Sequence, residues 1–272
     1  MELVLLHVAT LLYLAPTVLA VAGLWGRGPV PRRALPAFLW AAAACHAVSI
    51  GLRSLAVRHL AVTTFPESLS FLALVIVGMY LLLQLRRNLG ALGAVVSPLA
   101  FGLTLAADVA HTKAQPLPPE LQSVWLPAHV MLAVLGDAVF ALAFSASLLY
   151  LLQERRLKAH RRGFWRHLPS LETLDRLNYQ CLVWGLVLLT LGIATGIIWA
   201  HEAWEKMFWA SDPKLVFSLV TWAIYVLLLQ GRLTAGWRGR WAAELTIAGF
   251  AVIVLSLVGV NVLAIGLHGK AF

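Results

Sequence analysis

The sequence predicts an all-α fold: a polytopic membrane bundle of eight transmembrane helices forming a single domain over residues 1–272. Hydrophobic residues make up 61% of the chain and charged residues only 12%, whereas soluble domains carry about 25% charged residues. The mean hydropathy is +0.83. Lipid cannot satisfy free backbone amides, so spanning segments must be helices or closed barrels, and the sequence lacks the alternating pattern of a barrel.

Eight segments reach the length of about 20 apolar residues that a bilayer core about 30 Å thick requires. They are 3–25, 35–57, 66–85, 90–107, 126–152, 178–200, 213–231 and 242–267. The first begins almost at Met1, has Glu2 in place of a basic stretch, and is followed by no evident small-residue cleavage site. We therefore expect a retained helix and not a signal peptide.

Local signals refine the predicted helix ends. In LPSLETLDRLNYQ (168–180), Ser170 can cap a helix and the leucines share one face, which predicts a short interfacial helix before the sixth span. Asp212 and Pro213 have the residue types of an N-cap and a first helical position, so they should start the seventh span.

Glycine and proline interrupt several spans. Pro16, Pro98, Gly192 and Gly196 could mark broken helices of a transporter. No repeated pair of such segments is evident, so we interpret the small residues as sites of close helix packing.

The positive charge is concentrated in alternate loops. The chain has 21 basic and 12 acidic residues, and most of the basic ones follow the first, third, fifth and seventh spans. The positive-inside rule then places both termini outside. The net charge of +9 is therefore explained by topology, with a surface for acidic lipid or a cytoplasmic partner as the second interpretation, and we expect no nucleic-acid partner.

The two cysteines, Cys45 and Cys181, both fall inside predicted spans. The sequence has no CxxC or CxxCH motif, so we expect neither a dithiol redox centre nor covalent attachment of a c-type haem to this chain.

Four histidines, His59, His129, His201 and His268, fall at the outer ends of predicted spans. A single histidine in a membrane is more often a hydrogen-bonded packing residue, but several at one depth also suit metal ligation. Imidazole is the usual axial ligand of haem, and two imidazoles on opposite faces hold the iron six-coordinate. His129 and His268 lie on different helices at matching depth, which such a pair requires, and His59 and His201 at the same face are reserve ligands.

Asp137 lies about two turns deeper in the membrane than His129. A carboxylate inside a span is either functional or part of a hydrogen-bond network. A structural role is the interpretation that we favour from the sequence.

The outer connection HEAWEKMFWASDPK (201–214) is rich in aromatic residues. Trp204, Phe208 and Trp209 could belong to an interfacial belt, or they could form a flat apolar platform for a porphyrin. Three cations at similar depth are candidates to pair with propionates, namely Lys214, Arg53 and Arg58.

Several longer motifs carry a resemblance to a known family. They are LPAHVMLAVLGDAVFALAF (126–144), TGIIWAHEAW (195–204), WASDPKLVFSLVTWAIY (209–225), GWRGR (236–240) and VGVNVLAIGLH (258–268), with FPESLSFL (65–72) upstream. In these motifs the chain resembles the cytochrome c assembly family of haem-handling membrane proteins, which includes CcsA, CcmC and HemX-like members.

The resemblance implies that haem b is held non-covalently at the outer face, with His129 and His268 as axial ligands and metal-binding residues. The aromatic loop would cover the haem, and Asp212 would shape its end. The haem would be presented to apocytochrome c or to another assembly subunit, in a multi-pass protein of the bacterial cytoplasmic membrane. The chain would then be a haem-handling or accessory protein more than a stand-alone enzyme.

Departures from the family pattern favour the HemX-like branch. Ser211 replaces the last tryptophan of the loop motif, Gln230 a deep histidine, and Leu215 the glutamate after DPK, while Trp204 is offset by one residue. The alternative function is a membrane scaffold that regulates haem synthesis by binding glutamyl-tRNA reductase through the basic loop 153–177.

Overall fold

The computed structural model describes residues 1–24, 34–86, 89–111, 123–159, 169–203 and 212–262. Within these ranges the chain is helical and contains no strand. The helices are α1 Glu2–Leu24, α2 Ala34–Val57, α3 Phe65–Arg86, the 3₁₀ turn η1 Gly90–Leu92, α4 Gly93–Val109, α5 Trp125–Lys158, α6 Leu171–Ala203, α7 Pro213–Thr234 and α8 Arg240–Val262. Eight segments of this described part are long and apolar enough to cross a membrane. The predicted all-α, multi-pass bundle is therefore confirmed.

The region before the sixth span differs from its prediction. Residues from Leu171 onward belong to one continuous helix of 33 residues, so a separate interfacial helix does not exist. The hydroxyl of Ser170 accepts a hydrogen bond from the amide of Thr173 at 3.2 Å, which confirms the cap. Leu174 and Leu177 are buried in the bundle. Their burial draws the start of α6 into the bundle and leaves no reason for a break.

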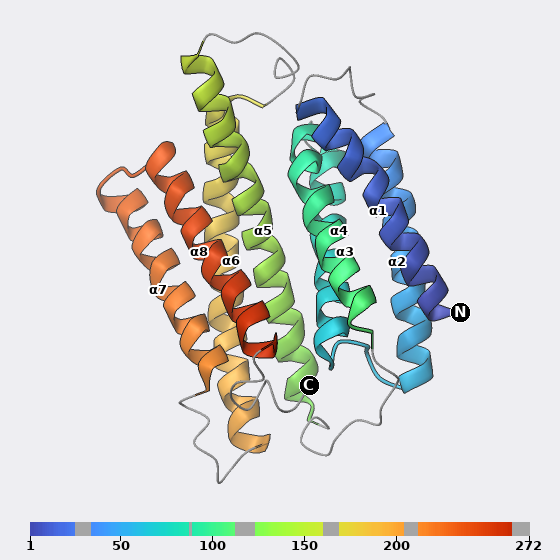
Figure 1. Cartoon of the computed structure of the whole chain (residues 1–272). Coiled ribbons are helices and arrows are strands. Elements are labelled where there is room, and N and C mark those ends of the chain that lie inside the picture. The colour runs from blue at the N-terminus through green and yellow to red at the C-terminus, as the bar shows by residue number, and fades with distance from the viewer. Residues whose placement is uncertain (25–33, 87–88, 112–122, 160–168, 204–211, 263–272) are drawn as a thin grey trace.

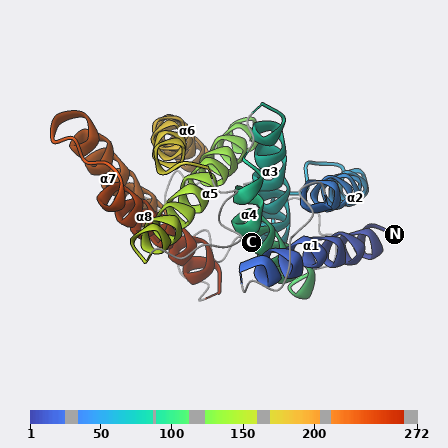
Figure 2. The ribbon, with the colours of Figure 1, turned by 90° about the horizontal axis from the view of Figure 1, so that it is seen from above.

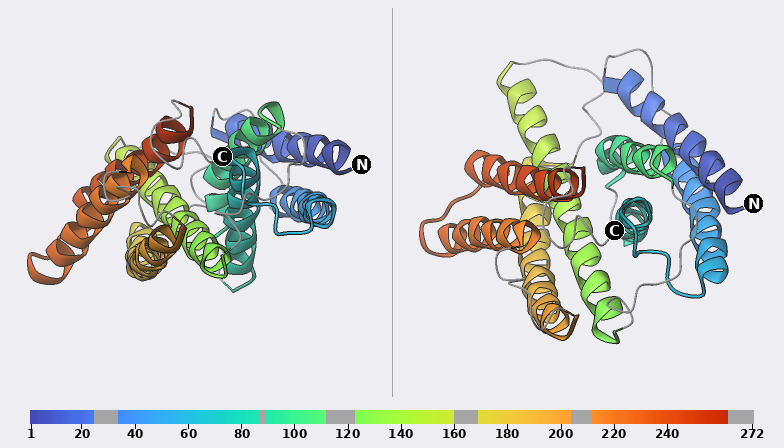
Figure 3. Two further views of the ribbon diagram at one scale, coloured as in Figure 1. Left: turned by 90° about the horizontal axis from the view of Figure 1, so that it is seen from below. Right: turned by 60° about the horizontal axis from the view of Figure 1, so that its bottom comes forward.

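The helices form two groups that meet at the middle of the molecule (Figures 1 and 2). Helices α1, α2, α3 and α4 pack in one group, and α5, α6, α7 and α8 pack in the other. Contacts between α3 and α5 join the groups, and the two tilted views of Figure 3 show α5 next to both halves. Helix α5 is therefore the central helix of the described structure.

Small residues let α5 and α6 approach closely. A Cβ atom at Gly185 would lie 2.6 Å from the Phe140 ring, so only glycine fits there. The Phe140 ring in turn stacks on Tyr225 of α7, with ring centroids 4.0 Å apart. Helices α5, α6 and α7 thus pack together at one aromatic pair.

A buried polar cluster ties α5, α6, α7 and α8 together. Arg232 donates to the Asp175 carboxylate at 2.8 Å and to the amide oxygen of Asn178 at 2.9 Å. Asn178 donates to the hydroxyls of Ser147 at 2.7 Å and Thr246 at 2.9 Å. Buried polar groups must be paired in this way, and here the pairing joins four helices.

The two ends of the bundle differ in charge. Helices α5 and α7 end at the top of Figure 1, where the last turn of α7 carries Arg232 and the last turn of α5 carries Arg155, Arg156 and Lys158. The start of α5, the end of α6 and the start of α7 lie at the opposite end, as does the N-terminus (Figure 1). This polarity is the one that the positive-inside rule uses, and the side of the membrane on which the termini lie stays a prediction.

Candidate functional site

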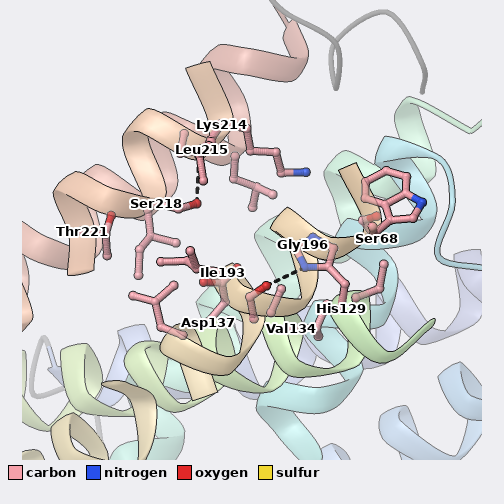
Figure 4. A pocket seen from close by; sticks show the side chains of 18 of the residues that line it. Ser68, His129, Val134, Asp137, Ile193, Gly196, Lys214, Leu215, Ser218 and Thr221 are labelled. Carbon is pink, nitrogen blue, oxygen red and sulfur yellow. Dashed lines mark hydrogen bonds between the residues drawn. The ribbon is translucent and has the colours of Figure 1, made fainter. Parts of the chain in front are cut away.

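A cavity of about 180 Å³ lies among α3, α5, α6, α7 and α8. Its walls are largely apolar, with residues such as Leu72, Val134 and Leu189. The polar groups that line it are Ser68, His129, Asp137, Asp212, Lys214, Ser218, Thr221 and Ser256. Figure 4 shows His129 and Asp137 approaching the cavity from one side and Lys214, Ser218 and Thr221 from another. An apolar cavity with a few convergent polar groups is the usual form of a small-molecule site.

The imidazole of His129 is oriented by helix α6. Its Nδ1 atom donates a hydrogen bond to the carbonyl oxygen of Gly192 at 2.9 Å (Figure 4). Because a carbonyl can only accept, Nδ1 carries the hydrogen and the Nε2 atom of the neutral ring carries the lone pair. A carbonyl behind a histidine in this way is the common support of a metal-ligating imidazole.

Three residues of α6 form the surface against which His129 rests. A Cβ atom at Gly196 would lie 2.7 Å from the His129 Cε1 atom. The imidazole ring therefore fits beside α6 because residue 196 has no side chain. Trp199 is buried and stacks on the imidazole, with ring centroids 5.9 Å apart and an interplanar angle of 18°. Gly192, Gly196 and Trp199 recur at helical spacing, which puts them on one face of α6.

The start of α7 places Lys214 at the cavity. Asp212 is the N-cap, its carboxylate accepts from the Lys214 amide at 2.9 Å, and Pro213 occupies the first helical position. The predicted start of the seventh span is therefore confirmed. One turn later, the Ser218 hydroxyl donates to the Lys214 carbonyl at 2.8 Å. The cap fixes the first turn of α7, and with it the backbone that carries the lysine.

Asp137 lines the same cavity from α5. Within the described ranges its carboxylate accepts no hydrogen bond, so the network role that the sequence favoured is not what the structure shows there. The Lys214 ammonium is a charged group that lines the same cavity from α7.

The family model described as cytochrome C assembly protein matches residues 62–268 of the chain. The chain belongs to the cytochrome c assembly protein family. The match spans the cavity residues from α3 to α8, and the resemblance predicted from the sequence motifs is confirmed.

Individual relatives of this family agree with the match. The chain is 32% identical over 247 residues to the cytochrome c biogenesis protein CcsA of Guillardia theta, covering 83% of this chain and 82% of the relative. It is 30% identical over 311 aligned positions to CcsA of Synechococcus elongatus, covering 96% and 94%. It is 31% identical over 262 residues to CcsA of Porphyra purpurea, covering 82% of each protein. These relatives carry the CcsA name and do not support assignment to the HemX-like branch.

The structure brings three of the predicted site residues to the cavity of this family member: His129, Asp212 and Lys214. The contribution of Gly192 and Gly196 was not assigned from the sequence, although their spacing ahead of Trp199 could have indicated a histidine-binding face. The sequence favoured a structural role for Asp137, and the structure places this residue in the wall of the cavity.

Other predicted site residues lie apart from the cavity. Arg53 donates to Glu2 and to Glu67, both at 2.9 Å, in an ion-pair cluster of α1, α2 and α3. Arg58 is exposed and has a positive φ of 60°. His59 contacts the carbonyl of Leu60 at 3.0 Å, and His201 is exposed. None of the four predicted residues lines the cavity.

The remaining predicted residues fall outside the described ranges. They are Trp204, Phe208, Trp209 and His268. The aromatic platform and the pairing of His129 with His268 therefore stay predictions.

Proposed function

We propose that this chain handles haem during cytochrome c maturation, binding it non-covalently as haem b with His129 as an axial ligand. The observation that carries the proposal is the orientation of His129 by the Gly192 carbonyl at the wall of an apolar cavity. Membership of the cytochrome c assembly family and the names of the CcsA relatives support the same role.

The described residues fit an iron porphyrin. The imidazole has its hydrogen on Nδ1, which leaves the Nε2 lone pair as the ligating one, and the supporting carbonyl increases its basicity. Apolar walls suit the porphyrin ring, and the Lys214 ammonium suits a propionate. When bound, the haem supplies an iron centre that takes imidazole ligands, and it is the cargo that the protein carries.

The remaining parts of the proposal rest on the family resemblance. His268 would be the second axial ligand, and Trp204, Phe208 and Trp209 would cover the ring. The recipient would be apocytochrome c or another assembly subunit on the extracytoplasmic side. The charge difference between the two ends of the bundle supports that side. The cavity is lined by residues from the start of α5, the end of α6 and the start of α7, and these helix ends lie away from the basic last turn of α5.

Reduced-minus-oxidised absorption spectra of purified protein test the proposal. Wild-type protein from haem-replete cells should show a bis-histidine spectrum. His129→Gly should lose it, and added imidazole should restore it, because a free imidazole can occupy the vacated ligand position. His201→Ala is the matched control, since His201 is exposed and lies outside the cavity, and it should keep the spectrum. An unchanged spectrum in His129→Gly without imidazole would overturn the proposal.

A further inference from the structure

Two opposite charges face the cavity from different helices. Asp137 belongs to α5 and Lys214 to the first turn of α7, and both line the cavity (Figure 4). Each attracts the other, and Asp212 is a second carboxylate that attracts Lys214. In the described part of the chain Asp137 and Lys214 form no direct ion pair, so the attraction acts across the cavity.

The surroundings of Asp137 do not explain its presence. Its carboxylate accepts no hydrogen bond from any described residue, and its neighbours in the cavity wall include the apolar Val134 and Ile193. A carboxylate in an apolar interior is costly unless a cation or a set of donors compensates it. Among the described residues that line the cavity, Lys214 is the cation that can do so. Lys214 is therefore the group in the cavity wall that can stabilise the charged form of Asp137.

The Lys214 ammonium is also the group that suits a carboxylate of a ligand. A porphyrin propionate that reached Lys214 would enter a site that already holds two carboxylates, those of Asp137 and Asp212. Like charges in one low-dielectric site repel each other, so a single ammonium cannot fully stabilise both the propionate and the Asp137 carboxylate. The two must compete for it.

We propose that Asp137 is a counter-ion that competes with the propionate of the bound porphyrin for Lys214. This competition weakens the binding of the porphyrin in the cavity. The inference deepens the proposed haem-binding function and rests on it. Asp137 is a carboxylate that stays opposite Lys214 when no ligand carboxylate is present. Asp137 also prevents very tight binding of the porphyrin, which suits a protein that must transfer its ligand to another protein.

The test compares two iron porphyrins on purified, full-length protein. One is hemin, with ionised propionates, and the other is its dimethyl ester, in which both charges are removed. Dissociation is followed as transfer of the porphyrin to excess apomyoglobin. Asp137→Asn should slow the dissociation of hemin by about tenfold, and Lys214→Gln should accelerate it by about tenfold. Neither variant should change the dissociation of the ester.

A second carboxylate provides an independent arm. Leu215 lines the same cavity and follows Lys214 in the chain, so Leu215→Glu brings a competing charge from α7. It should accelerate the dissociation of hemin in the wild-type background and reverse the effect of Asp137→Asn in the double variant. Glu244→Gln, which removes a carboxylate outside the cavity, is the matched control and should leave both porphyrins unaffected. If Asp137→Asn does not fold, the Leu215→Glu variant still tests whether a carboxylate in the cavity competes with the propionate.

Three results would overturn the inference: no effect of Asp137→Asn on hemin, a faster dissociation of hemin, or an equal effect on the ester. If Asp137→Asn does not fold, an unchanged hemin rate in Leu215→Glu would overturn it as well. In each case the proposed function survives as long as the wild-type protein binds hemin with a spectrum that depends on His129. If the wild-type protein binds neither porphyrin, the proposed function and the inference fall together.

Discussion

The Nδ1 atom of His129 lies 2.9 Å from the carbonyl oxygen of Gly192, so a helix other than its own orients the ring. This bond selects the ring nitrogen that is left to ligate. The close contact of Gly196 with the same ring adds a steric limit, because a side chain there would occupy the place of the imidazole. The position of His129 therefore depends on how closely α5 and α6 pack.

Gly196→Ala should impair haem binding by displacing the imidazole. The new Cβ atom would lie 2.7 Å from Cε1 and 2.8 Å from Nδ1 of His129, and a contact that short must be relieved by movement of the ring. We expect weaker hemin binding and a changed absorption spectrum. Gly102→Ala is the control, because a Cβ atom there meets nothing within 4 Å. Equal hemin affinity in the two variants would show that α6 does not position the ligand.

Asp212→Ala should destabilise the protein by about 1 kcal/mol, because the N-cap of α7 is lost. The carboxylate accepts from the Lys214 amide at 2.9 Å, and alanine cannot accept that bond. Asp212→Ser keeps a capping oxygen and should retain most of the stability. Thermal unfolding in detergent measures both variants. A similar loss in the serine variant would mean that the charge of Asp212 matters more than its cap.

Arg53→Gln should destabilise the bundle and leave the preference for porphyrin propionates unchanged. Arg53 is bound by Glu2 and Glu67, each at 2.9 Å, and its removal leaves two carboxylates without their cation. A cost of roughly 2 to 3 kcal/mol follows for a pair at the edge of the bundle.

The measurements for Arg53→Gln are thermal unfolding and the ratio of affinities for hemin and its dimethyl ester. Arg58→Gln, at an exposed neighbouring position, is the control for both. A fall of the affinity ratio toward that of Lys214→Gln would show that Arg53 is a propionate partner, as expected from its position in the sequence.

Arg232→Met should cost about 3 kcal/mol of stability or more, since it leaves the Asp175 carboxylate without its cation and the Asn178 amide oxygen without its donor. Arg240→Met removes a cation from an exposed pair with Glu244 and should leave the unfolding temperature unchanged. Unfolding followed by circular dichroism in detergent compares the two variants. Equal stability of both would contradict the role of the Arg232 cluster in joining α6 to α7.

The spans were predictable because their signal is local. An apolar run of sufficient length becomes a helix in lipid whatever its neighbours are, and the predicted and observed bounds differ mostly by a few residues at each end. The start of α7 was equally local, since Asp212 and Pro213 cap a helix by their own chemistry. The start of α6 was predicted incorrectly because only the burial of Leu174 and Leu177 in the bundle decides whether that stretch is a separate helix.

The site was predictable only in part. The residue types and depth of His129 and Lys214 indicated a ligand site, and both line the cavity. Depth says nothing about position around the bundle, which is why Arg53, at a suitable depth, belongs to a different cluster. The neighbours of Asp137 likewise depend on the packing of α5 against α7 and α8, which no local pattern encodes.

The sequence by itself determined the helical membrane class, the ends of most helices and the family, because hydropathy, capping and motif spacing act over short stretches of chain. Only the tertiary structure decided that the Gly192 carbonyl orients His129, and that Asp137 faces Lys214 across a cavity. Those relationships join residues from different helices. They arise from the way side-chain volumes fit between the helices, and that fit is a property of the whole bundle.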